Sequence, residues 1–320
     1  MNPFRFTPYL KSVIWGGEKI ASLKNIKTDA TDIGESWEIS AVPGCETRVA
    51  DGPDAGLTLT ELIDRYREHL VGRKVWDQFQ TSFPLLVKII DARADLSVQV
   101  HPDDTLAADR HGCAGKTEMW YILDTEPGAK IYAGLSAELT PDTYRRAIHD
   151  NTIMSYIKAH DSAPGDTFFL PAGRVHAIGA GNLLLEIQQT SDITYRIYDY
   201  DRRDAAGRPR ELHTEQAIDA IDYQVYPNYK SDPEPIAPGV DSLARCKYFD
   251  VRLHTVDTPT PVDYAPDSFV IVSCVSGHIG ISTGSDSPIR VDCGETLLIP
   301  ADRQQLILSG SGRAVTAFIP

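Results

Sequence analysis

The stretch GDTFFLPAGRVHAIGAGN, residues 165–182, decides the fold. An apolar run leads into a Pro-x-Gly turn, and a second apolar segment begins close to His176. Short apolar runs separated by Gly and Pro are typical of β-strands joined by tight turns. The histidine by itself indicates no function, because a lone histidine is more often an ordinary surface or core residue.

A weaker copy of this stretch recurs near the end of the chain, at residues 294–306, GETLLIPADRQQL. In both copies five residues separate a glycine from a proline, and the residue five positions after the proline is polar. That position holds His176 in the first copy and Gln305 in the second. We interpret the copies as a degenerate internal duplication in which only the first unit kept the histidine. Retention in one unit alone favours a binding role for His176.

Composition and charge narrow the class of protein. The chain has 320 residues, 42% hydrophobic and 24% charged, as in an ordinary globular protein with a sizeable core. Its net charge of −14 argues against binding to nucleic acids or anionic membranes, which require basic surface. Five scattered cysteines without a CxxC pair predict buried free thiols in a reducing compartment. No apolar run is long enough for a signal peptide or a membrane span, so we expect a cytoplasmic protein.

Most of the sequence alternates short apolar runs with Gly, Pro and Asp, which predicts an all-β sandwich or barrel. The predicted strands include ESWEIS (35–40), LLVKIID (85–91), LSVQVHP (96–102), EMWYILD (118–124), AKIYAGL (129–135), DTFFLPAG (166–173) and LLLEIQQ (183–189). Amphipathic spacing predicts helices at 57–72, 140–151 and 214–222.

A Pro-rich polar segment, YPNYKSDPEPIAPGVD at 226–241, has the composition of a linker. We therefore predict two domains, residues 1–228 and residues 229–320. The first carries the predicted helices and the histidine-bearing copy. The second is expected to be a degenerate β domain without a metal site.

Four polar residues at predicted strand ends are candidate metal ligands: Gln99, His101, Glu118 and His176. Gln99 and His101 are two residues apart, so on a strand both point to the same face. Taken singly, each of the four has an ordinary explanation, such as the wetted face of an edge strand or a solvated carboxylate. Imidazole and oxygen ligands without thiolates suit a catalytic Zn²⁺ site, although other divalent ions accept the same ligand types.

These motifs resemble those of a known family. The opening stretch fits the second cupin motif, and four further segments are similar to the type I mannose-6-phosphate isomerases in their short bacterial form: GESWEIS (34–40), QVHPDD (99–104), KTEMWYI (116–122) and LLLEIQQTSDITYRIYDYDR (183–202). The resemblance runs from about residue 15 to about residue 215 and covers the C-terminal block only loosely. It implies two cupin-type jelly rolls and one Zn²⁺ per chain, bound by the four candidate ligands. Gly115 departs from the histidine of the longer members, which affects only the role of that position.

The resemblance also implies the reaction, the interconversion of mannose 6-phosphate and fructose 6-phosphate through a cis-enediolate, with Arg196 as the active-site arginine. Without the resemblance, a salt bridge from Arg196 to a nearby aspartate would be the preferred explanation. Lys116 is the preferred general base, because a neighbouring dication disfavours its ammonium form; a water on the metal and Glu186 are alternatives. Further candidates for contacts to the sugar or its phosphate are Lys88, Arg202, Arg203, Glu186, Glu35 and Glu38.

Two other functions stay open at this point. One is a non-catalytic cupin that binds sugar phosphates, because a fold alone does not fix a function. The other is a metal-dependent cupin oxygenase, which would favour two histidines and a carboxylate around iron. In every case the expected partner is a small sugar phosphate, with no nucleic acid and no membrane, and the chain is expected to be a monomer or a homodimer.

Overall fold

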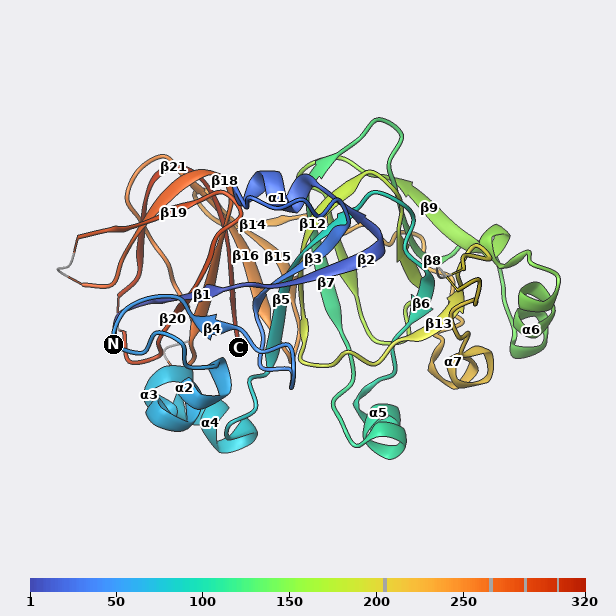
Figure 1. Cartoon of the computed structure of the whole chain (residues 1–320), viewed down its shortest axis with the longest axis horizontal. Coiled ribbons are helices and arrows are strands. Elements are labelled where there is room, and N and C mark those ends of the chain that lie inside the picture. Colours follow the sequence, from blue (N-terminus) through green and yellow to red (C-terminus); the bar gives the residue numbers. More distant parts are fainter. Residues whose placement is uncertain (204–205, 265–266, 285–286, 304) are drawn as a thin grey trace.

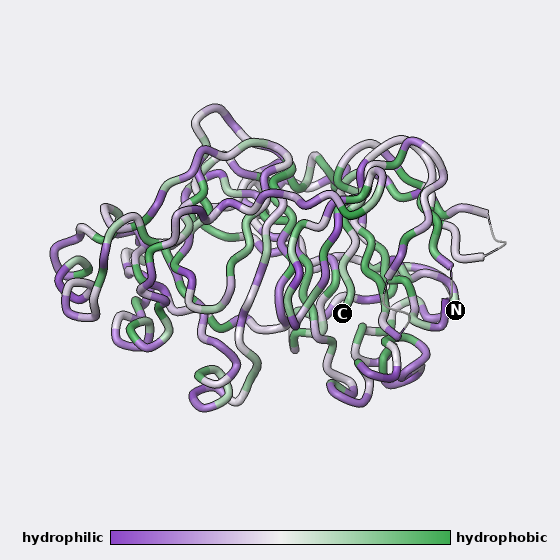
Figure 2. The backbone as a smooth tube through the Cα atoms, turned by 180° about the vertical axis from the view of Figure 1, so that it is seen from behind, coloured by the Kyte–Doolittle hydropathy of each residue, from purple (hydrophilic) through white to green (hydrophobic). Residues whose placement is uncertain are grey.

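The computed structural model describes residues 1–320 except 204–205, 265–266, 285–286 and 304. The described residues form three antiparallel sheets of six, five and ten strands with helices around them, so the expected all-β class is confirmed (Figure 1). Hydrophobic stretches follow the strands in the middle of the molecule, and hydrophilic stretches gather in its peripheral loops and helices (Figure 2). No helix in these residues combines the length and apolarity needed to cross a membrane.

Two sheets form a sandwich in the N-terminal half. The six-stranded sheet has the order β10 (Thr167–Leu170), β7 (Glu118–Thr125), β12 (Asn182–Gln189), β5 (Leu85–Ala92), β3 (Ile33–Ile39) and β2 (Tyr9–Gly17). The five-stranded sheet has the order β13 (Tyr195–Tyr198), β6 (Val98–Val100), β11 (His176–Ile178), β8 (Lys130–Leu135) and β9 (Ile157–Asp161).

The ten-stranded sheet is built mainly by the C-terminal half. Its main path is β14 (Glu234–Ala237), β15 (Val240–Arg245), β16 (Asp250–Val256), β21 (Ile307–Phe318), β18 (Val270–Ser282), β20 (Thr296–Ile299), β1 (Phe4–Thr7) and β4 (Arg48–Val49), with β17 (Thr260–Pro261) beside β21 and β19 (Ile289–Asp292) beside β18. The first strand, β1, therefore lies in the same sheet as the last strand, β21. Its Phe4 is paired with Leu298 on β20.

Because side chains alternate along a strand, each sheet has two different faces. The sheets are stacked in layers through these faces. One face of the six-stranded sheet packs on the five-stranded sheet, through a core that includes Trp15, Ile90, Trp120, Ile122, Ile131, Ala133, Ile178 and Leu184. Its other face packs on the C-terminal half, through Val87, Ile89, Met119, Leu185, Val251, Ile271, Leu298 and Val315 among others. Because both faces are covered, strands such as β5 and β12 are buried along their whole length.

The helices differ in part from the sequence prediction. Helices α6 (Pro141–His149) and α7 (Thr214–Ala220) form as expected, and Thr140 caps α6. The prediction of a single helix at 57–72 is wrong. The segment forms two helices, α2 (Leu59–Tyr66) and α3 (Glu68–Val71), and α4 (Arg73–Phe79) follows them. Arg67 breaks it with a φ of +50°. Helices α1 (Lys19–Leu23) and α5 (Asp104–His111) and a 3₁₀ turn at Ile153–Tyr156 were not predicted.

Helices α2 to α4 contact both halves of the chain. Gly72, between α3 and α4, has a φ of +92°, and a Cβ there would lie 2.1 Å from the carbonyl oxygen of Asp267. The backbone N–H groups of Ala301 and Phe269 donate hydrogen bonds to carbonyl oxygens of α3. Glycine is required where the helical segment meets the C-terminal half this closely.

The strand registers support the internal duplication. In the first unit, Leu170 precedes the proline and is paired with Glu118 on β7. In the second unit, Ile299 precedes the proline and is paired with Val270 on β18. The second unit thus has a valine at the position of Glu118, in addition to the glutamine at the position of His176. Two of the four candidate ligands, Glu118 and His176, are therefore replaced in the second unit.

The segment predicted as a linker is anchored to the N-terminal half. Tyr229 is buried against Gly134, where a Cβ would lie 2.0 Å from its ring, and its hydroxyl donates to the carbonyl oxygen of Leu135 at 2.9 Å. Strands β14 and β15 already begin within the segment. All five cysteines are free as expected, but only Cys274 is buried.

Tyr229→Phe should lower stability, because the backbone N–H groups of Leu135 and Tyr226, which donate to the Tyr229 hydroxyl at 3.1 and 2.9 Å, lose their acceptor. We expect the free energy of unfolding to fall by about 1–3 kcal/mol in urea titrations. Tyr156→Phe is the control, since the Tyr156 hydroxyl makes no hydrogen bond within the described residues. Equal stability of the two variants would contradict the anchoring role.

Candidate metal centre

Strand alternation directs three predicted site residues of the five-stranded sheet into the sandwich. Gln99 lies between Val98 and Val100, which pack on the outer face against α6 and α7, so its own side chain points inward. His176 and Arg196 are paired with Gln99 on the two neighbouring strands, which places all three on the same inner face. The sequence predicted only that Gln99 and His101 share one strand face, and the structure adds that the side chain of Gln99 points into the sandwich.

The four candidate ligands converge, although they are far apart in the chain. The Nε2 atom of His101 lies 3.6 Å from Oε2 of Glu118, and Nε2 of His176 lies 3.2 Å from Oε1 of the same carboxylate. Nε2 of Gln99 lies 3.2 Å from Nε2 of His176. The two histidines and the glutamate are buried, and their ligand atoms lie within 4.8 Å of one another. The four side chains that the sequence suggested as ligands therefore lie beside one another.

Both imidazoles present the same nitrogen to the centre. Nδ1 of His101 lies 2.9 Å from the carbonyl oxygen of Ile193, and Nδ1 of His176 lies 2.8 Å from that of Arg174. A hydrogen bond donated by Nδ1 leaves the lone pair of Nε2 free to bind a metal ion. Burial lowers the pKa of His101 well below its usual value and that of His176 to about 4, so both rings are neutral at physiological pH.

Three central atoms of the cluster have no hydrogen-bond partner within the described residues. Nε2 of His101 and both carboxylate oxygens of Glu118 are buried without such a partner. Burial raises the pKa of Glu118 to about 7, and the ammonium of Lys116, 3.4 Å from Oε2, opposes this shift. Buried polar atoms without partners are costly, and a dication at their common centre would satisfy them. A nitrogen and oxygen donor set without thiolates fits Zn²⁺ in a catalytic site.

A second group of charges lies beside the cluster on the six-stranded sheet. Lys88 and Glu186 are paired across β5 and β12, and Nζ lies 3.1 Å from Oε2. The indole N–H of Trp120 donates to Oε1 of Glu186 at 2.9 Å, and Oε2 of Glu35 lies 3.7 Å from the Lys88 ammonium. The sequence suggested Lys88 and Glu186 as site residues, but it did not indicate that they form a buried pair.

This pairing controls the protonation of both groups. Burial alone would lower the pKa of Lys88, but Glu186 and Glu35 outweigh it and raise that pKa. Burial alone would raise the pKa of Glu186, but the ammonium groups of Lys88 and Lys116 hold it below its usual value. Across the cluster and this pair, two lysines face three carboxylates, so the region favours an additional cation.

The arginines are placed differently from one another. Arg196 donates to Oγ of Ser97 at 3.3 Å and to the carbonyl oxygen of Glu211 at 2.9 Å. Asp199, three residues after Arg196, is instead bound by Arg202 and Arg210. The guanidinium of Arg196 is thus free of any carboxylate within the described residues. The sequence did not predict that Ser97, two residues before Gln99, accepts a hydrogen bond from Arg196.

The structure does not bring Arg202 and Arg203 to the ligand cluster. Arg202 also donates to the carbonyl oxygen of Asp95, and the exposed Arg203 donates to that of Gly207 at 2.9 Å. An arginine that is hydrogen bonded to a carboxylate and a carbonyl oxygen must lose those bonds before it can bind a phosphate. The local sequence does not show that Arg202 makes these bonds.

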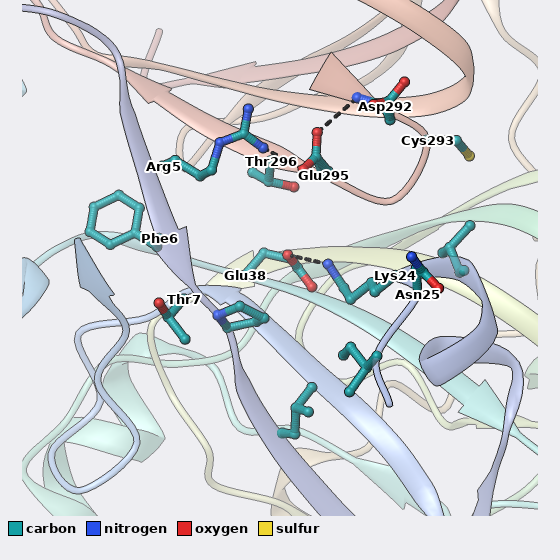
Figure 3. Close-up of a pocket in the computed structure, with 14 residues that line it drawn as sticks. Arg5, Phe6, Thr7, Lys24, Asn25, Glu38, Asp292, Cys293, Glu295 and Thr296 are labelled. Carbon is teal, nitrogen blue, oxygen red and sulfur yellow. Dashed lines mark hydrogen bonds and ion pairs between the residues drawn. The ribbon is translucent and has the colours of Figure 1, made fainter. Parts of the chain in front are cut away.

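The two glutamates of GESWEIS point to opposite faces of β3. Glu35 accepts from the indole of Trp37 at 2.6 Å on the side of Lys88. Glu38 lines a separate cavity of about 570 Å³ between the two halves, where Lys24 donates to Oε2 at 2.8 Å (Figure 3). Because side chains alternate along a strand, the expectation that both glutamates line one pocket is wrong.

The fold and this cluster define the chain as a cupin with a buried His/Glu/His set of candidate metal ligands. Residues 4–128 match the family model "Phosphomannose isomerase type I, catalytic domain", and residues 240–319 match "Mannose-6-phosphate isomerase, cupin domain". The chain therefore belongs to the type I phosphomannose isomerase family and is an enzyme, as the sequence motifs indicated.

Individual relatives cover the chain almost completely. It is 35% identical over 322 residues to mannose-6-phosphate isomerase ManA of Bacillus subtilis, which spans 99% of both chains. It is 41% identical over 220 residues to mannose-6-phosphate isomerase of Streptococcus mutans, or 69% of this chain and 68% of that protein. A crystal structure of the mannose 6-phosphate isomerase from Bacillus subtilis superposes with a TM-score of 0.89 at 32% identity, over 99% of each chain.

Removing one imidazole should abolish metal binding. His176→Ala deletes a nitrogen ligand at the centre of the cluster, and we expect the purified variant to lose its stoichiometric metal, measured by elemental analysis. His254→Ala is the matched control, because His254 is equally buried but lies in the C-terminal half beside Thr316. A His176→Ala variant that retains its metal would show that the ligand set is wrong.

Breaking the buried pair should be costly. Lys88→Met leaves the carboxylates of Glu186 and Glu35 buried without their nearest cation, and we expect the free energy of unfolding to fall by about 3–5 kcal/mol in urea titrations. Lys130→Met is the control, because the Lys130–Asp161 pair is exposed and screened by solvent, so its loss should change stability much less. Similar small effects in both variants would show that Lys88 is not needed to balance the charges.

Proposed function

We propose that the chain interconverts D-mannose 6-phosphate and D-fructose 6-phosphate with one Zn²⁺, for which Gln99, His101, Glu118 and His176 are the ligands. The observation that carries the proposal is the buried cluster in which Nε2 of His101 and both oxygens of Glu118 have no hydrogen-bond partner among the described residues. Lys116 lies beside Glu118, and Arg196 is paired with Gln99 on the neighbouring strand. Membership of the family supplies the reaction class. For Gln99 to act as a ligand, its carboxamide turns so that the oxygen faces the centre, a rotation that ordinary side-chain freedom permits.

The protein must stabilise negative charge that develops on substrate oxygens when a proton moves between C1 and C2. A bound Zn²⁺ supplies Lewis-acid polarisation of such oxygens. Arg196 retains its proton at any working pH and can donate two parallel hydrogen bonds to a cis-enediolate. Its two present acceptors are a hydroxyl and a backbone carbonyl, both neutral, so an anionic substrate competes well for the guanidinium.

Lys116 is the proposed general base. Its Nζ lies 3.4 Å from Oε2 of Glu118, next to the position where the substrate carbons are expected. Glu186 is less suited to the role, because Lys88 and Lys116 lower its pKa and thereby weaken it as a base. We assign Glu186 and Lys88 to charge balance at the substrate-facing wall. Phosphate contacts from Lys88 and Arg202 stay predictions.

Turnover with and without chelator tests the function. The purified enzyme should convert mannose 6-phosphate to fructose 6-phosphate, as followed by NMR, and a chelator should abolish conversion until Zn²⁺ is restored. Arg196→Gln and Lys116→Gln should each lower kcat by about 10²–10⁴-fold while metal content is preserved, since each removes a group that acts in the transition state.

Other outcomes distinguish the alternatives. Binding of mannose 6-phosphate without turnover would indicate a sugar-phosphate-binding cupin, and consumption of oxygen would indicate an oxygenase. The cytoplasmic location and the monomeric or homodimeric state are predictions that cell fractionation and size-exclusion chromatography with light scattering address.

A further inference from the structure

The segment between α5 and β7 carries Lys116 and leads directly into Glu118, the first residue of β7, and residues 112–117 have no regular secondary structure. It is pressed against the start of α5. A Cβ on Gly115 would lie 2.5 Å from the backbone nitrogen of Asp104, and Lys116 N donates to the carbonyl oxygen of Pro102 at 3.1 Å. The position of the base and the central ligand therefore depends on what holds this short segment.

Two polar side chains bind the backbone of the segment. Oδ1 of Asp104 accepts from the backbone N–H of Gly115 at 3.1 Å, and Oε1 of Gln189 accepts from that of Thr117 at 2.9 Å. Nε2 of Gln189 also donates to Oδ1 of Asp104 at 3.0 Å, so the two anchors support one another. The bonded residues lie immediately before Lys116 and immediately before Glu118.

The second oxygen of Asp104 is bound by the C-terminal half. Oδ2 accepts from the hydroxyl of Tyr248 and lies 3.3 Å from Nζ of Lys247, both in the turn between β15 and β16. The bond from Tyr248 is charge assisted, because these donors and the backbone hold the pKa of Asp104 below its usual value despite partial burial. A continuous set of hydrogen bonds thus runs from the turn at Tyr248 to the segment of Lys116.

The segment borders a cavity at its first residues. This cavity, of about 890 Å³, has among its walls Asp104, Cys113, Ala114, Gln189 and Tyr248. Residues 115–117 themselves are buried, so packing and the hydrogen bonds from Asp104 and Gln189 together position Lys116.

We propose that Asp104 and Gln189 are positioning residues for Lys116 and Glu118, and that Tyr248 fixes Asp104 from the C-terminal half. The second cupin unit, which lacks the ligands, thereby contributes to the active site without touching substrate or metal. The effect on catalysis rests on the proposed isomerase function. The anchoring itself does not.

Tyr248→Phe removes one hydroxyl and changes little else. We expect kcat for mannose 6-phosphate to fall about 10-fold, because small displacements of a base lower the rate, while KM and metal content stay unchanged. Tyr66→Phe is the control, since it removes a similar bond of 2.8 Å to Asp54 at the end of α2 and should leave kcat within twofold. An unchanged kcat in Tyr248→Phe would overturn the proposal.

A double-mutant cycle separates positioning from general destabilisation. If Tyr248 acts only through Asp104, the Asp104→Ala variant and the Asp104→Ala/Tyr248→Phe variant should have the same kcat. Independent effects would multiply, and that result would contradict the proposed coupling.

Amide hydrogen exchange tests the anchoring without substrate and without an Asp104 variant. Residues 115–117 should exchange faster in Tyr248→Phe than in the wild type and in Tyr66→Phe. Unchanged exchange would overturn the anchoring even if kcat falls. If the wild-type protein does not convert mannose 6-phosphate, the isomerase function is refuted. Faster exchange of residues 115–117 in Tyr248→Phe would still support the anchoring in that case.

Discussion

The structure depends on the neutralisation of one buried carboxylate. Glu118 is fully buried with both oxygens lacking hydrogen-bond partners among the described residues, and a carboxylate in that state is expensive unless cations surround it. Among the described residues, Lys116 is the cation that lies nearest to its oxygens, and the adjacent Lys88 is already shared between Glu186 and Glu35. The sandwich therefore encloses a region in which anions outnumber cations. Such a region is costly for folding and well suited to a divalent ion.

The second cupin unit is free of that cost. In it, Val270 occupies the register position of Glu118 and belongs to a cluster of buried apolar side chains. This unit therefore has no anion at that position to neutralise. Its sheet covers the face of the six-stranded sheet that points away from the five-stranded sheet, and its turn at Tyr248 reaches the segment of Lys116. We interpret the first unit as the one that holds the proposed metal site and the second as its support.

The sequence predicted those features that strand periodicity determines. Gln99 and His101 were expected on one strand face from their spacing, and the all-β class results from the alternation of short apolar runs with turns. It could not predict the features that depend on distant contacts. Arg67 interrupts a good helical pattern where α2 to α4 meet the C-terminal half, and Arg202 is engaged by Asp199 and Asp95. The contact of Tyr248 with Asp104 joins segments whose local patterns carry no sign of one another.

The pairing of β1 with β20 also has a kinetic meaning. Phe4 and Leu298 are neighbours in one sheet although nearly the whole chain separates them (Figure 1). Contacts between such remote residues close a very long loop and form slowly. During synthesis the first strand leaves the ribosome early and can pair with β4, but not yet with β20. The nascent chain therefore exposes one edge of β1 until most of the C-terminal half has been made, and the pairing with β20 then joins the two ends of the chain.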